Sequence, residues 1–238
     1  MLNRYYKCEN TKIFFQKWNV MVMTGIVIFV PVMVMTLDSF FGETGEMLCK
    51  SKLIQSFYLG QVGYTVLSAL FFGNEYQKSA LRTSLISTPD RRIFIITKLL
   101  CILTWTFIIL TLTTIISIIT ISTVRNDCPG TLEMVRILIP AYISTFEIVI
   151  ITSCLVVIMR SAIVPMAIIV SLILGLGNIL LQYSDKMKYL PVLSVMNGFL
   201  VENLPQYPDI ETGIFIQAVW SIDAFVCAFI LFRKRYVR

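Results

Sequence analysis

Two acidic residues interrupt long apolar stretches, and they are the side chains best placed for chemistry inside a membrane. Glu147 lies within residues 137–159 and Asp223 within residues 212–232. An ionised acid at the bilayer centre costs about 2.5 kcal/mol or more, so we expect both to face the protein interior. They could be neutral acids that hydrogen-bond between helices, which we favour, or they could line a cavity for a polar or cationic substrate. They could also carry protons in a coupled carrier.

Other polar side chains in the apolar stretches are candidates for the interior or for a transport pathway, above all Gln61, Tyr64 and Asn178. Serine and threonine commonly join helices in membranes, so they are weak evidence for a pathway. The chain has no histidine, which removes the commonest general base and the commonest transition-metal ligand. It also has no GxxxxGK[ST] phosphate loop. We therefore expect neither an enzyme nor a cofactor or metal bound by this chain.

The composition indicates that lipid is the solvent for the elements that hold these residues. Hydrophobic residues make up 57% and charged residues 14% of the 238 residues, and the mean hydropathy is +0.80. Soluble domains have about 45–50% apolar and about 25% charged residues, so a soluble enzyme and a disordered chain are excluded. Since about 20 apolar residues cross a bilayer, we predict an all-α, single transmembrane domain over residues 1–238. Its six expected spans are residues 19–37, 53–74, 99–124, 137–159, 161–184 and 212–232.

The distribution of charge predicts the orientation. An even number of spans places both termini on one side. If that side is the cytoplasm, fourteen of the twenty Lys and Arg residues lie inside, and most acids lie outside. Lys and Arg favour cytoplasmic loops, so we predict cytoplasmic termini in a multi-pass plasma-membrane protein. The net charge of +6 thus reflects orientation and predicts no nucleic-acid partner.

Two cysteines, Cys49 and Cys128, fall in the first two outer loops. They could form a disulfide on an oxidising outer face. Because the sequence gives no geometry, two unpaired thiols are the favoured expectation.

Three segments lie outside the expected spans. Residues 1–18 mix apolar side chains with four cations and predict a helix lying on the inner leaflet, a frayed charged tail being the alternative. Residues 74–92 predict a short cytoplasmic helix with Asn74 as its N-cap, which either docks another protein or is a solvated loop. Residues 185–211 are apolar in the middle but broken by proline and glycine, which predicts a re-entrant or interfacial outer segment.

The layout and the loop of residues 74–92 together resemble the membrane subunit of a type-2 ABC exporter. That family has a Gly-x-Glu-Tyr pattern at the end of the second span, then Gly-Thr-Leu-Arg, a proline, a basic pair and a lysine. The matching residues here are Gly73, Glu75, Tyr76, Leu81, Arg82, Pro89, Arg91, Arg92 and Lys98. Ser79 and Ala80 depart from the family's Gly-Thr but remain small. The resemblance covers the whole chain in layout and about 25 residues in motif.

The resemblance implies a partner that supplies energy. The loop helix would be a coupling helix that docks on a separate ATP-binding subunit through Glu75, Tyr76, Leu81, Arg82, Leu85, Arg91 and Arg92. Two such subunits would bind ATP and Mg, and a second permease, identical or related, would complete the pathway. Residues 1–18 would be the connecting helix, and residues 185–211 would match the outer re-entrant helices. The compact chain is similar to bacterial permeases of lantibiotic or bacitracin self-immunity, which implies export of a hydrophobic or amphipathic substrate such as an antimicrobial peptide.

Two other function classes stay open at this point. A secondary carrier would use Glu147 and Asp223 as proton sites, although the two halves of the chain show no internal repeat. A membrane scaffold or peptide receptor would transport nothing.

Overall fold

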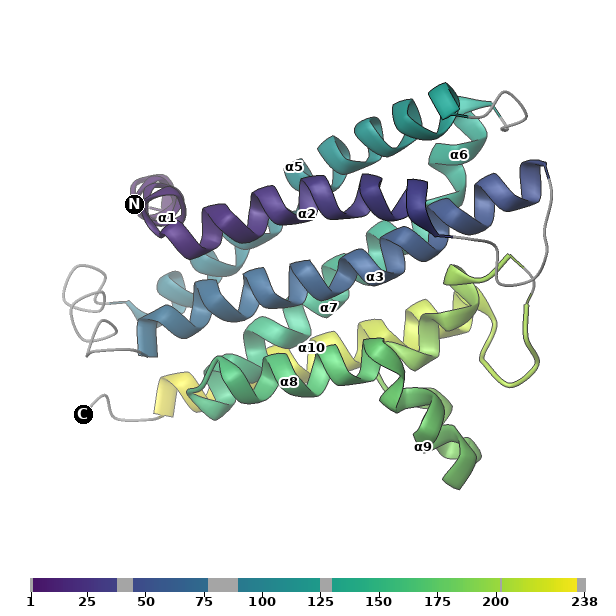
Figure 1. Cartoon of the computed structure of the whole chain (residues 1–238). Helices are drawn as coiled ribbons and strands as arrows, with labels where there is room; N and C mark the ends of the chain where they lie inside the picture. Colours follow the sequence, from purple (N-terminus) through teal and green to yellow (C-terminus); the bar gives the residue numbers. More distant parts are fainter. Residues whose placement is uncertain (1, 38–44, 77–89, 125–129, 202, 235–238) are drawn as a thin grey trace.

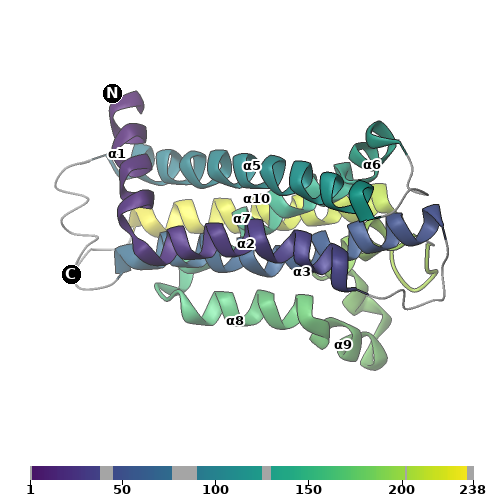
Figure 2. The ribbon, with the colours of Figure 1, turned by 45° about the horizontal axis from the view of Figure 1, so that its top comes forward.

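The computed structural model describes residues 2–37, 45–76, 90–124, 130–201 and 203–234, and every regular element in these ranges is a helix. The longer helices run side by side as a bundle in both ribbon views (Figures 1 and 2). They are α2 (Lys17–Thr36), α3 (Glu46–Gly73), α5 (Arg91–Val124), α7 (Ile139–Met159), α8 (Ile163–Ser171) and α10 (Ile210–Lys234). The start of the first helix, α1 (Leu2–Phe15), and the end of α10 lie at the same end of the bundle, on the left of Figure 1. We call this the α1 end.

Shorter elements join or cap the bundle. They are the 3-10 turn η1 (Asn74–Tyr76), α6 (Thr131–Ile137), the π-helical turn η2 (Leu172–Leu176), α9 (Gly177–Tyr183), and the 3-10 helices η3 (Asp185–Tyr189) and η4 (Leu193–Phe199). Helix α1 crosses the end of the bundle instead of continuing it (Figure 2). The expected N-terminal helix is thus confirmed as a helix, and its place on a membrane stays a prediction.

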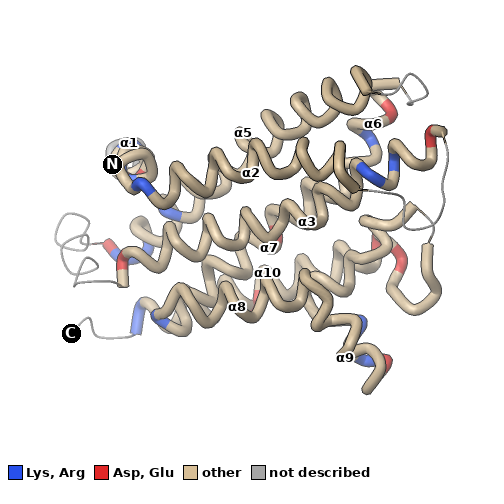
Figure 3. The backbone as a smooth tube through the Cα atoms, viewed as in Figure 1, with Lys and Arg blue, Asp and Glu red and all other residues tan. Residues whose placement is uncertain are grey.

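Within the described residues, five helices are long and apolar enough to cross a membrane. They are α2, α5, Thr131–Met159, Ile163–Tyr183 and α10. Their outward faces carry exposed large apolar side chains such as Ile28, Ile115 and Ile222, and charged residues gather near the two ends of the bundle (Figure 3). Both features are compatible with a multi-pass membrane protein.

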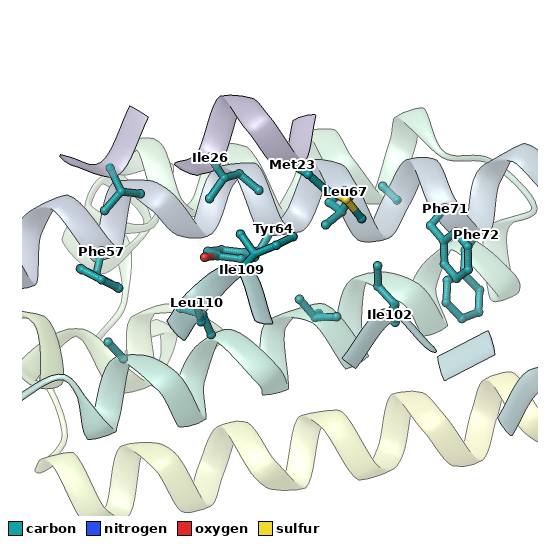
Figure 4. Packing of buried hydrophobic residues seen from close by; sticks show 14 of the residues in the cluster. Met23, Ile26, Phe57, Tyr64, Leu67, Phe71, Phe72, Ile102, Ile109 and Leu110 are labelled. Carbon is teal, nitrogen blue, oxygen red and sulfur yellow. The ribbon is translucent and has the colours of Figure 1, made fainter. Parts of the chain in front are cut away.

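Helix α3, where we expected the second of six spans, is not among these five. It is 28 residues long, but polar side chains such as Gln61 lower its apolarity. Most of its length packs against α2, α7, α8 and α5, so its polar groups meet protein. Tyr64 and Leu67 of α3 point into the core that Met23 and Ile26 of α2 and Ile109 of α5 complete (Figure 4).

Two helices begin earlier than the expected spans, because polar residues continue a helix beyond its apolar run. Helix α3 begins at Glu46, seven residues before the expected start, so Lys50 and Lys52 are helical. Helix α5 begins at Arg91, where the backbone N–H of Arg92 donates to the Asp90 carboxylate over 3.0 Å. Such a bond satisfies a free N–H group of the first turn.

The expected fifth span is broken. At η2 the chain passes through Gly175 with φ +120°, a conformation that disfavours any side chain. The break frees backbone groups, and the Tyr58 hydroxyl donates to the Ile173 carbonyl over 2.9 Å. After this turn α9 leans away from the bundle (Figure 1). The span is therefore two helices joined by a π turn.

Cys49 is disulfide-bonded, so the expectation of an unpaired thiol at this position is wrong. Cys8, Cys101, Cys154 and Cys227 are free, and Cys128 lies outside the described residues. Near Cys49, the Lys50 ammonium and the Glu133 carboxylate pair at 2.8 Å. An ion pair thus joins α3 to α6 at the end of the bundle opposite α1.

Residues 185–211 are not a second long helix. They form η3, η4 and a loop whose turns are held by the Asn197 side chain, which donates to the carbonyls of Leu204, Tyr207 and Pro208 at 3.0–3.2 Å. Helix η4 packs against α10 and α7. A Cβ at Gly213 of α10 would lie 2.0 Å from the Ser194 carbonyl oxygen of η4, so only glycine allows this approach. The segment caps the bundle opposite the α1 end.

Candidate functional site

Four charged side chains from three elements meet in the interior at the α1 end. Glu9 and Lys12 come from α1, Glu75 from η1 and Lys98 from the second turn of α5. Glu9, Glu75 and Lys98 are 5%, 6% and 2% exposed. We call these four residues the charge junction. It is the largest group of ionic contacts among the described residues.

The junction consists of two close ion pairs joined by longer contacts. Lys98 Nζ lies 2.7 Å from Glu75 Oε1, and Lys12 Nζ lies 2.6 Å from Glu9 Oε1. Lys98 is also 3.5 Å from Glu9, and Lys12 is 3.4 Å from Glu75. Two cations and two anions sum to zero charge. This neutrality is needed because an unpaired buried charge is strongly destabilising.

Aromatic rings complete the surroundings of Lys98. Its ammonium lies 4.5 Å from the centre of the Phe71 ring, 5.6 Å from that of Phe94 and 5.7 Å from that of Phe72. The ring faces attract a cation electrostatically. Two of these rings close α3 and the third opens α5, so the pocket for the ammonium exists only where these two helices meet.

The carboxylates of Glu9 and Glu75 change the pKa of the Lys12 ammonium. Burial alone would lower the pKa of the Lys12 ammonium, but the hydrogen bond and charge of Glu9, with those of Glu75, raise the pKa above its ordinary value. The protonated form is therefore favoured. The contacts with Glu9 and Glu75 thus favour the charged state of Lys12.

Helix α1 is fastened to α5 by more than charge. The Trp105 indole N–H donates to the Asn10 side chain, and the Tyr6 and Thr104 hydroxyls lie 2.7 Å apart. The Phe14 ring stands edge-on to Trp105, with the ring centres 4.8 Å apart. These partly exposed hydrogen bonds and the ring contact fix the register of α1 on α5.

The residues expected to dock an ATP-binding subunit fall into three groups. Glu75 belongs to the charge junction, so its carboxylate meets this chain's own lysines. Tyr76 is half-buried, Arg92 is exposed, and Arg91 donates to the Phe232 carbonyl over 3.4 Å. Leu81, Arg82 and Leu85 lie outside the described residues.

Asn74 is not the N-cap that we expected. It follows the last residue of α3 and opens the 3-10 turn η1, and its side chain donates to Gln16 over 2.9 Å. The same Gln16 oxygen accepts from Asn19 over 2.6 Å. Gln16 stands between α1 and α2, so the end of α3 is tied to the bend that joins the first two helices.

The two acids within the expected spans differ in placement, which corrects the expectation that both face the interior of this chain. Glu147 is 8% exposed and Asp223 is exposed. On α10, Gln217 and Ser221 are buried, and Asp223 is two residues beyond Ser221, on another side of the helix. Glu147 is therefore an interior group, and Asp223 lies on the surface of this chain.

The other candidate interior residues are likewise divided. Gln61 and Tyr64 are buried, Gln61 donating to the Ser144 hydroxyl over 2.8 Å. Asn178 of α9 is exposed and accepts a hydrogen bond from Tyr207 over 2.8 Å. Asn178 thus fastens the outer segment, whereas Gln61 and Tyr64 belong to the core.

An apolar groove of about 400 Å³ lies between α2 and α3 at the level of Leu174. Its walls include Gly25, Gly60 and Gly63. A Cβ at Gly63 would lie 2.5 Å from Ile26 Cγ1, so the two helices touch closely at the floor of the groove. The apolar lining suits an acyl chain or an apolar side chain, and it offers such a ligand few polar groups.

The charge junction was not anticipated from the sequence. Its one signal is Lys98, a lysine inside the apolar run of residues 93–103, because a charge in such a run needs a partner. No family model, curated protein or solved structure matches this chain. An assignment of function therefore depends on the arrangement of the chain's own residues.

Proposed function

We propose that this chain is the permease subunit of an ATP-binding-cassette exporter. One observation carries the proposal: Glu75, directly before residues 77–89, is held by Lys98 of α5 and Lys12 of α1. A force applied to that loop by another protein reaches two helices through buried ion pairs. Such a junction suits a membrane protein that receives motion from an ATPase and does no chemistry itself.

In this proposal, ATP and Mg bind to two copies of a separate subunit that docks on residues 74–92. Movement of η1 pulls Lys98, and with it α5, which is 34 residues long. It also pulls α1 and, through the Asn74–Gln16 bond, the bend before α2. The wall of the groove between α2 and α3 therefore moves with the loop, which switches the pathway between inward-facing and outward-facing states.

The proposal also assigns the membrane topology. Helix α3 crosses as the sixth span, shielded from lipid by the helices around it, and both termini lie in the cytoplasm of a bacterial cell. The disulfide at Cys49 supports this orientation, since disulfides persist on oxidising faces. Residues 185–211 then cover the outer face.

The apolar lining of the groove supports a hydrophobic or amphipathic substrate, such as an antimicrobial peptide or a drug. A second copy of this chain, or a related permease, provides the opposite wall in the bilayer. The exposed acid Asp223, which is costly against lipid, is consistent with a membrane partner that covers part of this surface.

The test begins with co-expression of the full chain and an ATP-binding subunit encoded beside it. We expect the two to co-purify and the substrate to stimulate ATP turnover. Glu75→Lys should abolish that stimulation, because it places a third cation in the junction. The double variant Glu75→Gln with Lys98→Gln should restore part of it, because two amides can hydrogen-bond across the 2.7 Å contact and leave the neutral pair of Lys12 and Glu9.

The double glutamine variant separates two roles for Glu75. If the Glu75 carboxylate acts by direct contact with the ATPase, this variant stays uncoupled although the fold is intact. The matched control is the exposed pair at the other end of the bundle: Glu133→Lys should leave stimulation unchanged. Failure of any ATP-binding subunit to co-purify, or transport by the purified chain in a proton gradient without an ATPase, would replace the proposal with a secondary carrier.

A further inference from the structure

Three helices meet at a polar cluster midway along the bundle. The amide groups of Gln61 on α3 and Gln217 on α10 both donate to Ser144 of α7, one to its hydroxyl over 2.8 Å and one to its carbonyl over 3.2 Å. Gln61, Gln217 and Ser144 are each 0% exposed. Glu147 lies three residues after Ser144, on the same side of α7. Two amides and a carboxyl group thus share one small region.

Each of these three side chains has an oxygen without a partner. Gln61 Oε1, Gln217 Oε1 and Glu147 Oε2 are all buried and make no hydrogen bond. A buried polar atom without a bond costs roughly 1–3 kcal/mol, and an unpaired buried charge costs more. Three such atoms in one cluster indicate that donors are supplied by something other than the surrounding side chains.

The number of missing donors defines what fits. If Glu147 is ionised, the cluster has three acceptors, and one water, with two O–H groups, satisfies only two. If Glu147 is a carboxylic acid, its O–H donates to the water and the water donates to both amide oxygens. One proton and one water therefore satisfy all three oxygens. The water then makes three hydrogen bonds, within the two to four that a buried water makes.

The surroundings offer no other neutralising charge. Within the described residues, Glu147 makes no hydrogen bond or ion pair. The helices packed against α7 carry their cations toward their ends: Lys50 and Lys52 on α3, Lys98 on α5, Arg136 on α6, and Arg233 and Lys234 on α10. Away from the helix ends, the other titratable groups on α7 and on the helices packed against it are neutral at pH 7 except Asp223: Tyr58 and Tyr64 on α3, Cys101 on α5, Tyr142 and Cys154 on α7, and Cys227 on α10. Helices α8 and η4 have none.

We propose that Glu147 is a proton-binding site, held as a neutral carboxylic acid that joins α3, α7 and α10 through a bound water and the oxygens of Gln61 and Gln217. The site neutralises the one buried acid in the middle of the bundle. It is independent of the charge junction and of any ATPase partner. The bound proton is a structural ligand of the bundle.

Infrared spectroscopy of the purified full-length chain tests this directly. A protonated carboxyl group absorbs at a higher frequency than carboxylate and amide groups, and its band shifts in D₂O. We expect one such band at neutral pH, lost in Glu147→Gln and kept in Asp223→Asn. If Glu147→Gln does not fold, Glu147→Asp assigns the band by shifting it, since the acid is kept on a shorter arm.

The hydrogen-bond partners are tested separately. Gln217→Leu and Gln61→Leu each remove an acceptor and should shift the Glu147 band to higher frequency. The matched control Gln55→Leu, on the same helix as Gln61 but bonded to Ser51, should leave it unchanged. A Glu147 band that emerges only on acidification would overturn the proposal. A carboxylate signal that depends on Na⁺ or K⁺ would overturn it too. So would equal band shifts in the Gln217→Leu, Gln61→Leu and Gln55→Leu variants.

Discussion

Replacing Lys98 by methionine should be the most damaging single change at the charge junction. Met keeps an unbranched apolar chain among the phenylalanine rings but removes the ammonium 2.7 Å from Glu75 and 3.5 Å from Glu9. Two buried carboxylates then share Lys12, whose side chain is 33% exposed. Removing one partner of a buried ion pair costs about 3–5 kcal/mol. At about 2–4 °C per kcal/mol for a chain of this size, the unfolding midpoint should fall by about 6–20 °C.

The assay follows thiols that are exposed on unfolding. Cys101 and Cys154 are free and buried, so a thiol-reactive dye reports loss of the core during a thermal ramp in detergent. The control is Glu133→Gln, which breaks the ion pair between Lys50 and Glu133. The side chains of Lys50 and Glu133 are 24% and 52% exposed. An exposed pair contributes about 0–1 kcal/mol, so this midpoint should barely move.

A double variant separates pairing from packing. Glu75→Gln with Lys98→Met removes the 2.7 Å pair and leaves the neutral 2.6 Å pair of Lys12 and Glu9. We expect it to recover at least half of the loss in Lys98→Met, since removing both charges costs less than stranding one. The reasoning fails if Lys98→Met shifts the midpoint no more than Glu133→Gln, or if the double variant loses the sum of the two single losses.

Three further outcomes can be measured as unfolding midpoints followed by tryptophan fluorescence, because a reductant or a high pH would disturb a thiol-reactive dye. Gly213→Ala forces a Cβ onto the Ser194 carbonyl and should cost about 1–3 kcal/mol, whereas Gly130→Ala meets open space and should be nearly neutral. A reductant should cost about 2–4 kcal/mol through the disulfide at Cys49, and Cys49→Ser should abolish its effect. Because folding raises the pKa of Lys12 above its ordinary 10.5, the stability it contributes is complete below pH 10.5. It is lost as pH rises through the higher folded pKa, and Lys12→Met should flatten that decline.

Apolar runs predict where the helices are, and caps and partners decide where they end. The run that starts at Leu99 locates α5, but the helix begins at Arg91 because Asp90 caps it. Lys98 marked the expected edge of the span, yet it is buried because Glu75, 23 residues earlier, lies beside it. The contact between Lys98 and Glu9 spans 89 residues. No local pattern reports a partner at that distance.

The sequence also could not distinguish Glu147 from Asp223. Each is a single acid near the middle of an apolar helix, and each carries the same expected cost. Their burial differs because α10 presents Gln217 and Ser221 to the bundle, and Asp223 lies on another side of the helix. Gln217 and Ser221 lie four residues apart on one side of α10 and Asp223 lies on another, and the sequence alone does not show which of these two polar sides faces the neighbouring helices.

The two buried polar assemblies balance charge differently, and this difference bears on movement. The charge junction is neutral because two cations meet two anions from three elements. Separating one of its pairs costs about 3–5 kcal/mol, so a displaced η1 carries α1 and α5 with it instead of leaving them behind. The proposed Glu147 site is neutral by protonation and holds α3, α7 and α10 without ionic contacts. Motion that enters at the loop is therefore expected to shift α1, α2, α5 and the end of α3 that η1 directly continues. The Glu147 site keeps the middle of α3 on α7 and α10, so the moving boundary falls at the groove between α2 and α3.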